Sequence, residues 1–379
     1  MGGATWAAPY RPVDPTVVLE RLPLKRGDTR AAELAKTRAL LAAQPNSPEL
    51  ALRVAEEYFD LATAEGDPRY IGYAQAALAP WATHSAAAPT DILFMRGKLL
   101  QWRHDFKPAL EIFGRVLQRE PDHFYALTWR AAVLTVLADY DAARRDCRTL
   151  QKNEDELYWA SCLAYIDSLT GQAAAAERRL ADLLARHSDA SPGNQLWLLT
   201  RLADLAARLG RPADADRYYR RGLALGVTSQ ILLANYGDFL IDENRPAEVV
   251  AMLREWTRSD VLLLRLTLAE QMLGVPEFKT HAQALRDRFA AAALRGDTLH
   301  QQEEAWFRLR VEHDPVRALA LAVANWAVQR ESYDARVLLE AAVAAGRPDR
   351  AQPALDWLAR SHHEDPRLTA LADKLKAER

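Results

Sequence analysis

This sequence has little cysteine, no long apolar run and no excess of charge of either sign. Among its 379 residues, Cys147 and Cys162 are the only cysteines, too few for a disulfide framework or a zinc site. They would pair only if the fold brought them together. We expect Cys147 to be a buried, inert thiol instead.

The net charge of −2 and the short apolar runs argue against two classes of partner. A protein held by nucleic-acid phosphates needs a basic face, and this chain has no surplus of positive charge to supply one. The best apolar candidate, residues 261–269, is too short to span a bilayer and contains Arg265. We therefore expect neither nucleic-acid binding nor a transmembrane segment.

Signals of catalysis or of a bound metal are missing as well. No HExxH, GxSxG or phosphate-loop pattern occurs, and no nucleophile or pair of carboxylates stands out. The cluster His362-His363-Glu364 and the pair Asp242-Glu243 are expected to be solvated surface. His104 and His123 lie near expected turns, where they could approach across one helix pair, but we do not expect them to bind a ligand. No catalytic residue, metal site or cofactor is predicted.

Helix-forming residues dominate what is present, and they recur with a regular spacing. Hydrophobic residues make up 49 %, with Ala and Leu prominent, which favours helices. In residues 90–121, Gly97 and Ala109 are small and Phe113 is large. This pattern fits two helices that cross closely, with a bulky side chain beside the crossing. Comparable trios follow along the chain: Ala131, Ala143 and Cys147; Ala164, Ala176 and Leu180; Ala203, Ala215 and Tyr219; Gly237, Val249 and Leu253.

The turns keep the same register. One signal occurs three times, with spacings of 34 and then 102 residues, at Gly210-Arg211-Pro212, Asn244-Arg245-Pro246 and Gly346-Arg347-Pro348. Gly or Asn supplies a left-handed C-cap, and Pro begins the next helix. Gly274-Val275-Pro276 and His313-Asp314-Pro315 stand where the two intervening turns are expected. Between Asp260 and Gly296 this register predicts a shortened first helix and a lengthened second helix.

With these residues the sequence resembles the tetratricopeptide-repeat family, of the bacterial multi-repeat type. The match is strong over residues 90–155 and 196–256, fair over 157–188 and 332–362, and weak elsewhere. The resemblance implies an all-α, right-handed superhelical solenoid of about nine antiparallel helix pairs. Its first helices would line a concave groove that binds a peptide or a partner protein. The family's first-helix Trp is replaced here by Leu, a core change that is tolerated if the packing adjusts.

Five segments are expected along the chain. They are an extended N-terminal arm (1–27), divergent helical repeats (28–89), well-matched repeats (90–258), irregular repeats (259–331), and a last repeat with a capping helix (332–379). The first regular helix is expected over residues 29–43 and the next from Ser47-Pro48 to about residue 63. The outer face of the last helix carries Arg367, Asp373 and Lys374, the polar cap that an open-ended stack needs.

The resemblance also predicts which residues face the groove. They are Phe94, Lys98, Gln101, Tyr125, Thr128, Tyr158, Ser161, Tyr165, Ser168, Trp197, Thr200, Asp204, Asn235 and Asp238, and further on Glu303, Phe307 and Arg310. Aromatic and hydroxyl side chains with few charges suit a peptide surface, although any single ring could instead pack between helices. Lys98 occupies a position used by carboxylate clamps in this family. Ala132 stands where the matching Asn is needed, so we do not expect such a clamp.

We expect a non-catalytic interaction scaffold that binds a peptide or partner protein in this groove. Two alternatives stay open. One is a small-ligand binder or enzyme with its site inside the superhelix, and the other is a structural subunit that self-associates through its ends or its proline-rich arm. Residues 4–11 contain small residues of the kind that follow a leader-cleavage site, which favours an exported, periplasmic protein over a cytoplasmic one.

Overall fold

The structure is built from helices. The computed structural model describes residues 29–81, 88–153 and 155–377, which form 20 α-helices and three short 3₁₀-helices without a strand. The expected N-terminal arm, residues 1–27, lies outside the described residues. The first eleven α-helices are α1 (Thr29–Ala43), α2 (Pro48–Glu65), α3 (Arg69–Ala77), α4 (Thr90–Trp102), α5 (Phe106–Arg119), α6 (Phe124–Val136), α7 (Tyr140–Thr149), α8 (Glu156–Ser168), α9 (Ala173–Arg186), α10 (Pro192–Arg208) and α11 (Pro212–Ala224).

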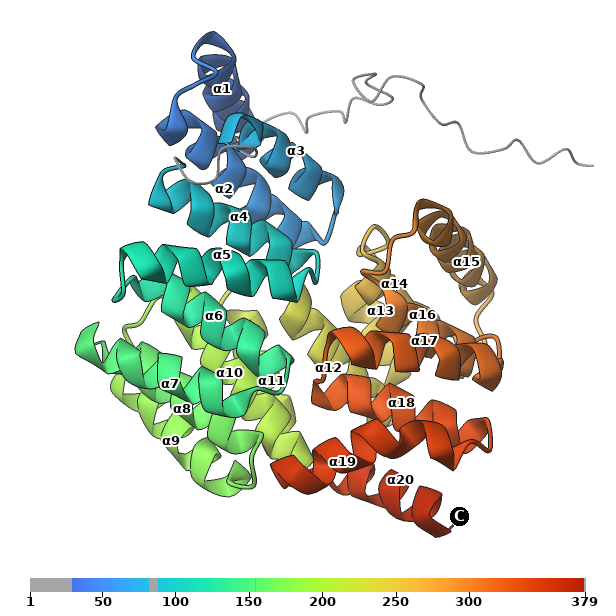
Figure 1. The fold of residues 1–379 in the computed structure, drawn as a ribbon. Helices are drawn as coiled ribbons and strands as arrows, with labels where there is room; N and C mark the ends of the chain where they lie inside the picture. Colours follow the sequence, from blue (N-terminus) through green and yellow to red (C-terminus); the bar gives the residue numbers. More distant parts are fainter. Residues whose placement is uncertain (1–28, 82–87, 154, 378–379) are drawn as a thin grey trace, which may run out of the picture.

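The remaining α-helices continue the same alternation. They are α12 (Gln230–Asp242), α13 (Pro246–Leu253), α14 (Asp260–Leu273), α15 (Glu277–Arg295), α16 (Gln301–Arg310), α17 (Pro315–Val328), α18 (Ser332–Ala344), α19 (Gln352–Ser361) and α20 (Pro366–Ala377). The helices from α2 on pair in sequence, and the first helices of successive pairs, α2, α4, α6 and onward to α20, contact one another along the whole series. These inner helices therefore line the concave side of a right-handed superhelical solenoid (Figure 1).

The predicted turns form as the sequence indicates. Gly210, Asn244, Gly274 and Gly346 all adopt left-handed conformations, with φ between 55° and 73°. His313 does the same at φ 55°, although a side chain disfavours this region. His313 keeps this left-handed conformation, despite its side chain, because the chain must turn before α17 begins two residues later at Pro315.

The predicted core trios are buried. At Gly97 an added Cβ would lie 2.4 Å from the Phe113 ring, so α4 and α5 approach each other as closely as a glycine allows. Ala109 and Phe113 are fully buried beside this crossing. The same positions are filled by buried side chains in the following pairs. The spacing of small and large residues therefore sets the distance between paired helices.

The expected free thiol at Cys147 is wrong. Cys147, near the end of α7, forms a disulfide with Cys162 in α8, and their Cα atoms are 5.7 Å apart. The bond joins the second helix of one pair to the first helix of the next. The bond can form only if these two helices lie close enough together. The repeat pattern does not give the distance between successive helix pairs.

The irregular pairs differ from the expectation in one respect. Helix α15, with 19 residues, is lengthened as predicted, but α14 has 14 residues and is not shortened. The short helices are the neighbours α13, with 8 residues, and α16, with 10. The 34-residue register is therefore restored by the short helices α13 and α16, which flank the α14–α15 pair, and not by a short helix within that pair.

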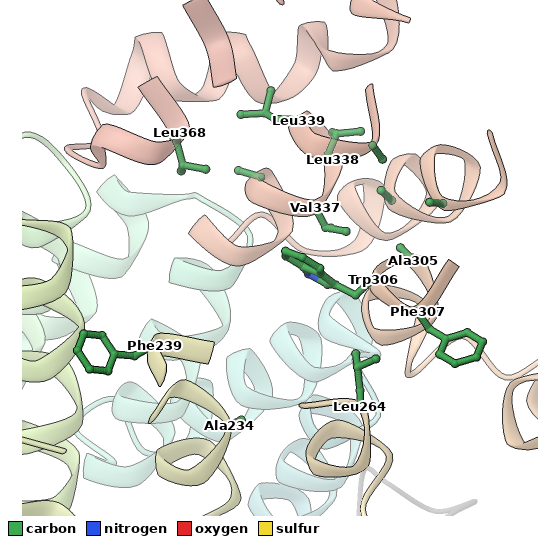
Figure 2. Close-up of a cluster of buried hydrophobic side chains, with 14 of the residues drawn as sticks. Ala234, Phe239, Leu264, Ala305, Trp306, Phe307, Val337, Leu338, Leu339 and Leu368 are labelled. Atoms are coloured by element: carbon green, nitrogen blue, oxygen red, sulfur yellow. The ribbon is translucent and has the colours of Figure 1, made fainter. Parts of the chain in front are cut away.

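The superhelix bends until its two halves meet. Helices α1–α11 form a first limb and α12–α20 a second, and the limbs join again where α19 and the segment between α19 and α20 reach α7, α9 and α10 (Figure 1). A continuous hydrophobic core runs through the second limb, from Ala234 and Phe239 through Leu264 and Trp306 to Leu368 (Figure 2). The same core includes Leu196 of α10 and Tyr219 of α11, and the rest of the first limb has several smaller cores.

Polar contacts close the ring between the limbs. Trp357 Nε1 donates to Tyr140 Oη at 3.0 Å, and the Arg330 amide donates to the Val136 carbonyl at 2.8 Å. The Ala173 amide, at the start of α9, donates to the Glu364 carboxylate at 2.5 Å. We call these the closing contacts. They tie α6, α7 and α9 to the last repeat.

The expectation that His362-His363-Glu364 forms a solvated cluster is wrong for His363, whereas His362 and Glu364 are exposed as expected. His363 is only 6 % exposed, and its Nε2 hydrogen-bonds the Ser332 hydroxyl at 3.0 Å and lies 3.5 Å from Arg208 Nη1. Glu364 holds the start of α9 through the closing contact. Burial, and then the positive charge of Arg208, lower the pKa of His363 to about 3. His363 is covered because the solenoid curves back on itself.

Candidate functional site

Aromatic rings on four inner helices of the first limb make contacts that join each helix to the next. The Phe94 and Tyr125 ring centroids are 6.1 Å apart, which links α4 to α6. Tyr158 on α8 packs edge-on against Phe124 at 4.8 Å, and Tyr165 packs against Trp197 on α10 at 5.9 Å. We call Phe94, Tyr125, Tyr158, Tyr165 and Trp197 the aromatic stripe. It follows the inner helices in chain order.

Two members of the stripe are open to solvent. Tyr125 is 58 % exposed and Trp197 is 36 % exposed, whereas Phe94, Tyr158 and Tyr165 are half-buried. Tyr158 Oη accepts a hydrogen bond from Asn194 Nδ2 at 3.1 Å, which fixes the ring beside the start of α10. Large, stiff rings held in place on one side and exposed on the other are suited to bind apolar side chains.

Cations lie beside the stripe. Lys98 Nζ lies 5.9 Å from the centroid of the Phe94 ring, and it is closer to two rings outside the stripe, Phe59 at 4.3 Å and Trp129 at 5.2 Å. The Arg201 guanidinium lies 4.2 Å from the Tyr165 ring and 5.5 Å from Trp197. Burial lowers the pKa of Lys98, and the carboxylates of Asp60 and Glu56 oppose this shift. The stripe therefore has a positively charged group at each end, held by cation–π contact.

Other predicted groove residues do not reach the surface. Ser161, Ser168 and Thr200 are buried, and each hydroxyl donates to a backbone carbonyl three or four residues earlier in its own helix. They fill space between inner helices. Gln101 and Thr128 are half-buried beside the stripe, and the Thr128 hydroxyl donates to the Phe124 carbonyl.

The predicted acidic positions belong to ion pairs. Asp204 accepts from Arg208 Nε at 3.0 Å, and Asp238 accepts from Arg265 Nε and Nη2 at 3.0 and 2.8 Å. Burial raises the pKa of Asp238 even though Arg265 opposes it. Asn235, one position off the stripe, is half-buried.

The residues expected further along have different outcomes. Phe307 is wrong as a groove residue, since it is fully buried and packs against Phe289 of α15 at 5.5 Å. Glu303 is buried as well, with His300 Nδ1 at 3.7 Å and Arg265 Nη1 at 3.8 Å. Burial opposes ionisation of Glu303, but these partners outweigh it and lower its pKa. Arg310 is exposed and pairs with Glu340.

His104 faces this same cluster from the other limb. Its ring stacks on Phe106 at 5.2 Å, and its charge interacts with Glu303 and His300. Burial lowers the pKa of His104 to about 4, so the ring is neutral at pH 7. His123 instead caps α6, accepting from the Ala126 amide at 3.1 Å, and packs against Phe94. No group of metal-binding side chains occurs in the part of the chain that the structure describes.

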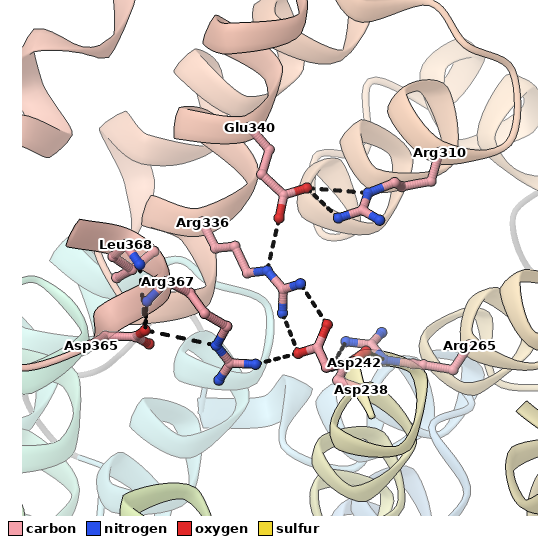
Figure 3. A network of polar contacts seen from close by, with 9 residues as sticks. All are labelled: Asp238, Asp242, Arg265, Arg310, Arg336, Glu340, Asp365, Arg367 and Leu368. Atoms are coloured by element: carbon pink, nitrogen blue, oxygen red, sulfur yellow. Dashed lines mark hydrogen bonds and ion pairs between the residues drawn. The ribbon is translucent and has the colours of Figure 1, made fainter. Parts of the chain in front are cut away.

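A network on the second limb escaped sequence-based prediction. Asp242 is exposed as a residue, as expected, but its side chain is only 18 % exposed and accepts two hydrogen bonds from Arg336, at 2.7 and 2.6 Å. Arg367 of α20 pairs with the same carboxylate, and Arg336 and Arg310 share Glu340 (Figure 3). The network joins α12, α16, α18 and α20. Its partners are up to 125 residues apart, so local spacing gives no signal for it.

Beside this network lies a pocket of about 170 Å³. Inner helices α12, α14, α16 and α18 all contribute to it. Its lining includes Asp238, Asp242, Gln271, Met272, Trp306, Arg310, Tyr333 and Arg336. A wider hollow of about 660 Å³ lies between α15 and the α16–α17 turn, where Arg286 and Glu312 pair at 2.8 Å. The smaller pocket lies on the concave face.

Comparison with solved structures agrees with this geometry. The APC/C hetero-tetramer Cut9–Hcn1 contains a chain that is superposed on 92 % of this chain and 67 % of its own length, at 13 % identity and a TM-score of 0.52. The chain has the tetratricopeptide-repeat fold. Within the described residues, nine inner helices are each followed by an outer partner: α2, α4, α6, α8, α10, α12, α14, α16 and α18. The inner helix α20 ends the described series.

Two further matches are looser. A tetratricopeptide repeat protein from Parabacteroides merdae has 18 % identity and a TM-score of 0.48, over 64 % of this chain and 93 % of that one. Human IFIT1, solved as a dimer with m7Gppp-AAAA, has 15 % identity and a TM-score of 0.45, over 88 % of this chain and 86 % of its own. No model of a known protein family and no curated protein matches the sequence. Among the described helices of this tetratricopeptide-repeat fold, none is long and apolar enough to cross a membrane.

Proposed function

We propose that this protein is a non-catalytic interaction scaffold that binds an extended segment of a partner protein along the aromatic stripe. The observation that supports it is that ring contacts join α4 to α6, α6 to α8 and α8 to α10, while Tyr125 and Trp197 stay exposed. Rings that only filled the core would be covered. These two expose contact area without needing to reorder on binding, because neighbouring rings hold them.

The chemistry of the stripe suggests the character of the segment. Apolar or aromatic side chains would pack on Tyr125 and Trp197, and main-chain groups would hydrogen-bond to half-buried polar side chains such as Gln101. Lys98 and Arg201 at the two ends favour acidic residues in the flanks of the segment. The overall charge of −2 supports a protein partner rather than a nucleic acid.

Selection from a peptide library tests this assignment. Wild type and the double variant Tyr125→Ala/Trp197→Ala would each be used to select displayed peptides, and affinities of the enriched peptides would be measured for both. Because anchor rings typically contribute 2 kcal/mol or more, we expect affinity to fall by at least about 30-fold in the double variant. Both residues are at least 36 % exposed, so the fold should persist.

A matched control comes from exposed side chains elsewhere. Tyr73→Ala/Val316→Ala removes an aromatic and an aliphatic group from α3 and the start of α17, and should leave peptide affinity within about twofold of wild type. Equal affinity for the stripe variant and the wild type would contradict the proposal, as would selection of no common peptide pattern.

We also propose that the protein works in an oxidising compartment. The support is the Cys147–Cys162 disulfide, because such bonds persist outside the reducing cytosol. Trapping free thiols with a mass-tagged maleimide during rapid lysis of native cells would test this. We expect no labelling before reduction and two labels after it. Complete labelling before reduction would refute the assignment.

A further inference from the structure

The pocket on the second limb is built from four inner helices. Asp238 and Asp242 come from α12, Gln271 and Met272 from α14, Trp306 and Arg310 from α16, and Tyr333 and Arg336 from α18. Its walls therefore come from four successive helix pairs. Figure 2 shows the Trp306 ring extending from α16 into the space between α12, α14 and α18.

The carboxylates of this pocket already have their partners. Asp238 is held by both donors of Arg265, and Tyr333 also hydrogen-bonds it. Asp242 is held by Arg336 and Arg367 (Figure 3). A cationic ligand would have to displace a guanidinium to reach either one. Each acidic group is matched by a basic one, so the pocket offers no net charge to attract an ion of either sign.

One buried polar atom of the pocket lacks a partner among the described residues. Trp306 is 4 % exposed, and its indole Nε1 has no hydrogen-bond partner among the described residues. Arg310 and Arg336 lie 4.8 and 5.2 Å from the Trp306 ring, and Tyr333 packs against it at 5.5 Å. The faces of the indole are thus occupied, and what it can still do is donate one hydrogen bond. A buried unpaired donor costs about 1–3 kcal/mol, which a bound acceptor would recover.

The rest of the lining defines what carries that acceptor. Leu268, Ile241 and Met272 add apolar surface, and Met272 is 45 % exposed. An apolar group would fit against these side chains while its acceptor faces the indole.

We propose that this pocket binds an uncharged amide on an apolar stem, with the amide carbonyl accepting from Trp306 Nε1. The natural source of such a group is a main-chain amide next to an aliphatic side chain in the same partner segment, so the inference extends the proposed function to a second contact point. The amide oxygen is a strong acceptor without charge, which suits the neutral pocket. The aliphatic group covers Met272 and Leu268.

Nuclear magnetic resonance of the whole protein tests the proposal. The probe is N-acetyl-L-leucinamide, titrated into ¹⁵N-labelled protein while the tryptophan indole signals are recorded. The sequence has 10 tryptophans, and the Trp306 signal is the one that disappears in Trp306→Phe. We expect this signal to move downfield and saturate with the probe. N-acetyl-L-leucine and L-leucinamide, which carry a negative and a positive charge, should bind at least about tenfold more weakly.

The methionine signals give a second readout. The sequence has only four methionines, so the Met272 methyl group can be assigned with Met272→Leu. In Trp306→Phe, the Met272 methyl shift should report probe affinity about fivefold weaker than in wild type, the value of one hydrogen bond.

The outcomes that overturn the proposal are specific. An unmoved Trp306 indole signal would exclude the contact, and an affinity for either charged probe equal to that for N-acetyl-L-leucinamide would exclude the preference for an uncharged group. The stripe variant Tyr125→Ala/Trp197→Ala should bind the probe as wild type does, because the pocket is built from other helices. Failure of peptide binding at the stripe would therefore leave this result unaffected, and the two proposals can fail separately.

Discussion

At Gly97 the packing of one helix pair depends on the absence of a single methyl group. A Cβ there would lie 2.4 Å from the fully buried Phe113 ring. We expect Gly97→Ala to destabilise the protein by about 1–3 kcal/mol, because the overpacking outweighs the gain of up to about 1 kcal/mol from better helix propensity. Urea denaturation followed by circular dichroism would measure the difference.

Gly114 gives the matched control on the same pair. It lies in α5, and an added Cβ would meet nothing within 4 Å. Gly114→Ala should therefore be neutral or stabilising by up to about 1 kcal/mol. If both variants were destabilised equally, the close approach of α4 and α5 would not be the cause.

The disulfide makes a second prediction for single residues. It closes a loop of 15 residues, and reduction should lower the free energy of unfolding by up to about 3 kcal/mol. Urea denaturation with and without dithiothreitol would measure this. The variant Cys147→Ala/Cys162→Ala should show no response to the reductant. If dithiothreitol left the free energy of unfolding of the wild type unchanged as well, the disulfide would be contradicted.

The residue scale shows what a repeat pattern can and cannot predict. Gly97, Ala109 and Phe113 were predictable because a close crossing restricts side-chain size at fixed spacings. The bond between Cys147 and Cys162 was not, since 5.7 Å between their Cα atoms follows from the stacking of pairs. Phe307 was misplaced for a related reason. It turns toward the lengthened helix α15, where Phe289 covers it.

At the scale of elements, burial of His363 in the segment between α19 and α20 makes the stability of the protein depend on pH. Its His363 is neutral in the folded protein, with a pKa of about 3 against an ordinary value near 6.5. Between these values the unfolded chain binds more protons than the folded one, so stability rises with pH across this window and falls as the solution is acidified. Asp204 partly opposes the effect of burial and Arg208.

A thermal unfolding series from pH 7 to pH 5 would reveal this contribution. We expect His363→Asn to remove a dependence of up to about 1.4 kcal/mol per pH unit that wild type shows. His362→Asn, at the exposed neighbouring position, should keep the wild-type slope. Identical slopes for wild type and His363→Asn would show that the imidazole is not buried in its neutral form.

The boundaries of most elements followed from caps and turns. Ser47 caps α2 by accepting from the Leu50 amide at 3.3 Å, and α1 spans Thr29–Ala43 as the sequence predicts. Even the left-handed turn at His313 fitted the register. What these local signals missed is the role of Asp242 at the end of α12, because Arg336 and Arg367 approach it only after the chain has turned through several more pairs.

For the whole molecule, closure of the superhelix is the property that the repeat pattern did not reveal. Each pair adds a small rotation, and the sum over many pairs decides whether the ends meet. The closing contacts at Tyr140, Ala173 and Val136 place the last repeat against the first limb. The predicted groove residues therefore fall into two groups. On the first limb the rings of Tyr125 and Trp197 are exposed, whereas on the second limb residues such as Asp238 form ion pairs.

Site-specific photo-crosslinking in the native cell tests most directly whether the inner face binds a partner protein. The photoreactive amino acid p-benzoylphenylalanine would replace Tyr125 on the stripe in one strain and Val316, which is 73 % exposed at the start of α17, in another. We predict a discrete protein adduct from position 125 that is lost when Trp197→Ala is added, and no such adduct from position 316. An adduct of the same mass from position 316, or none from position 125, would contradict the account.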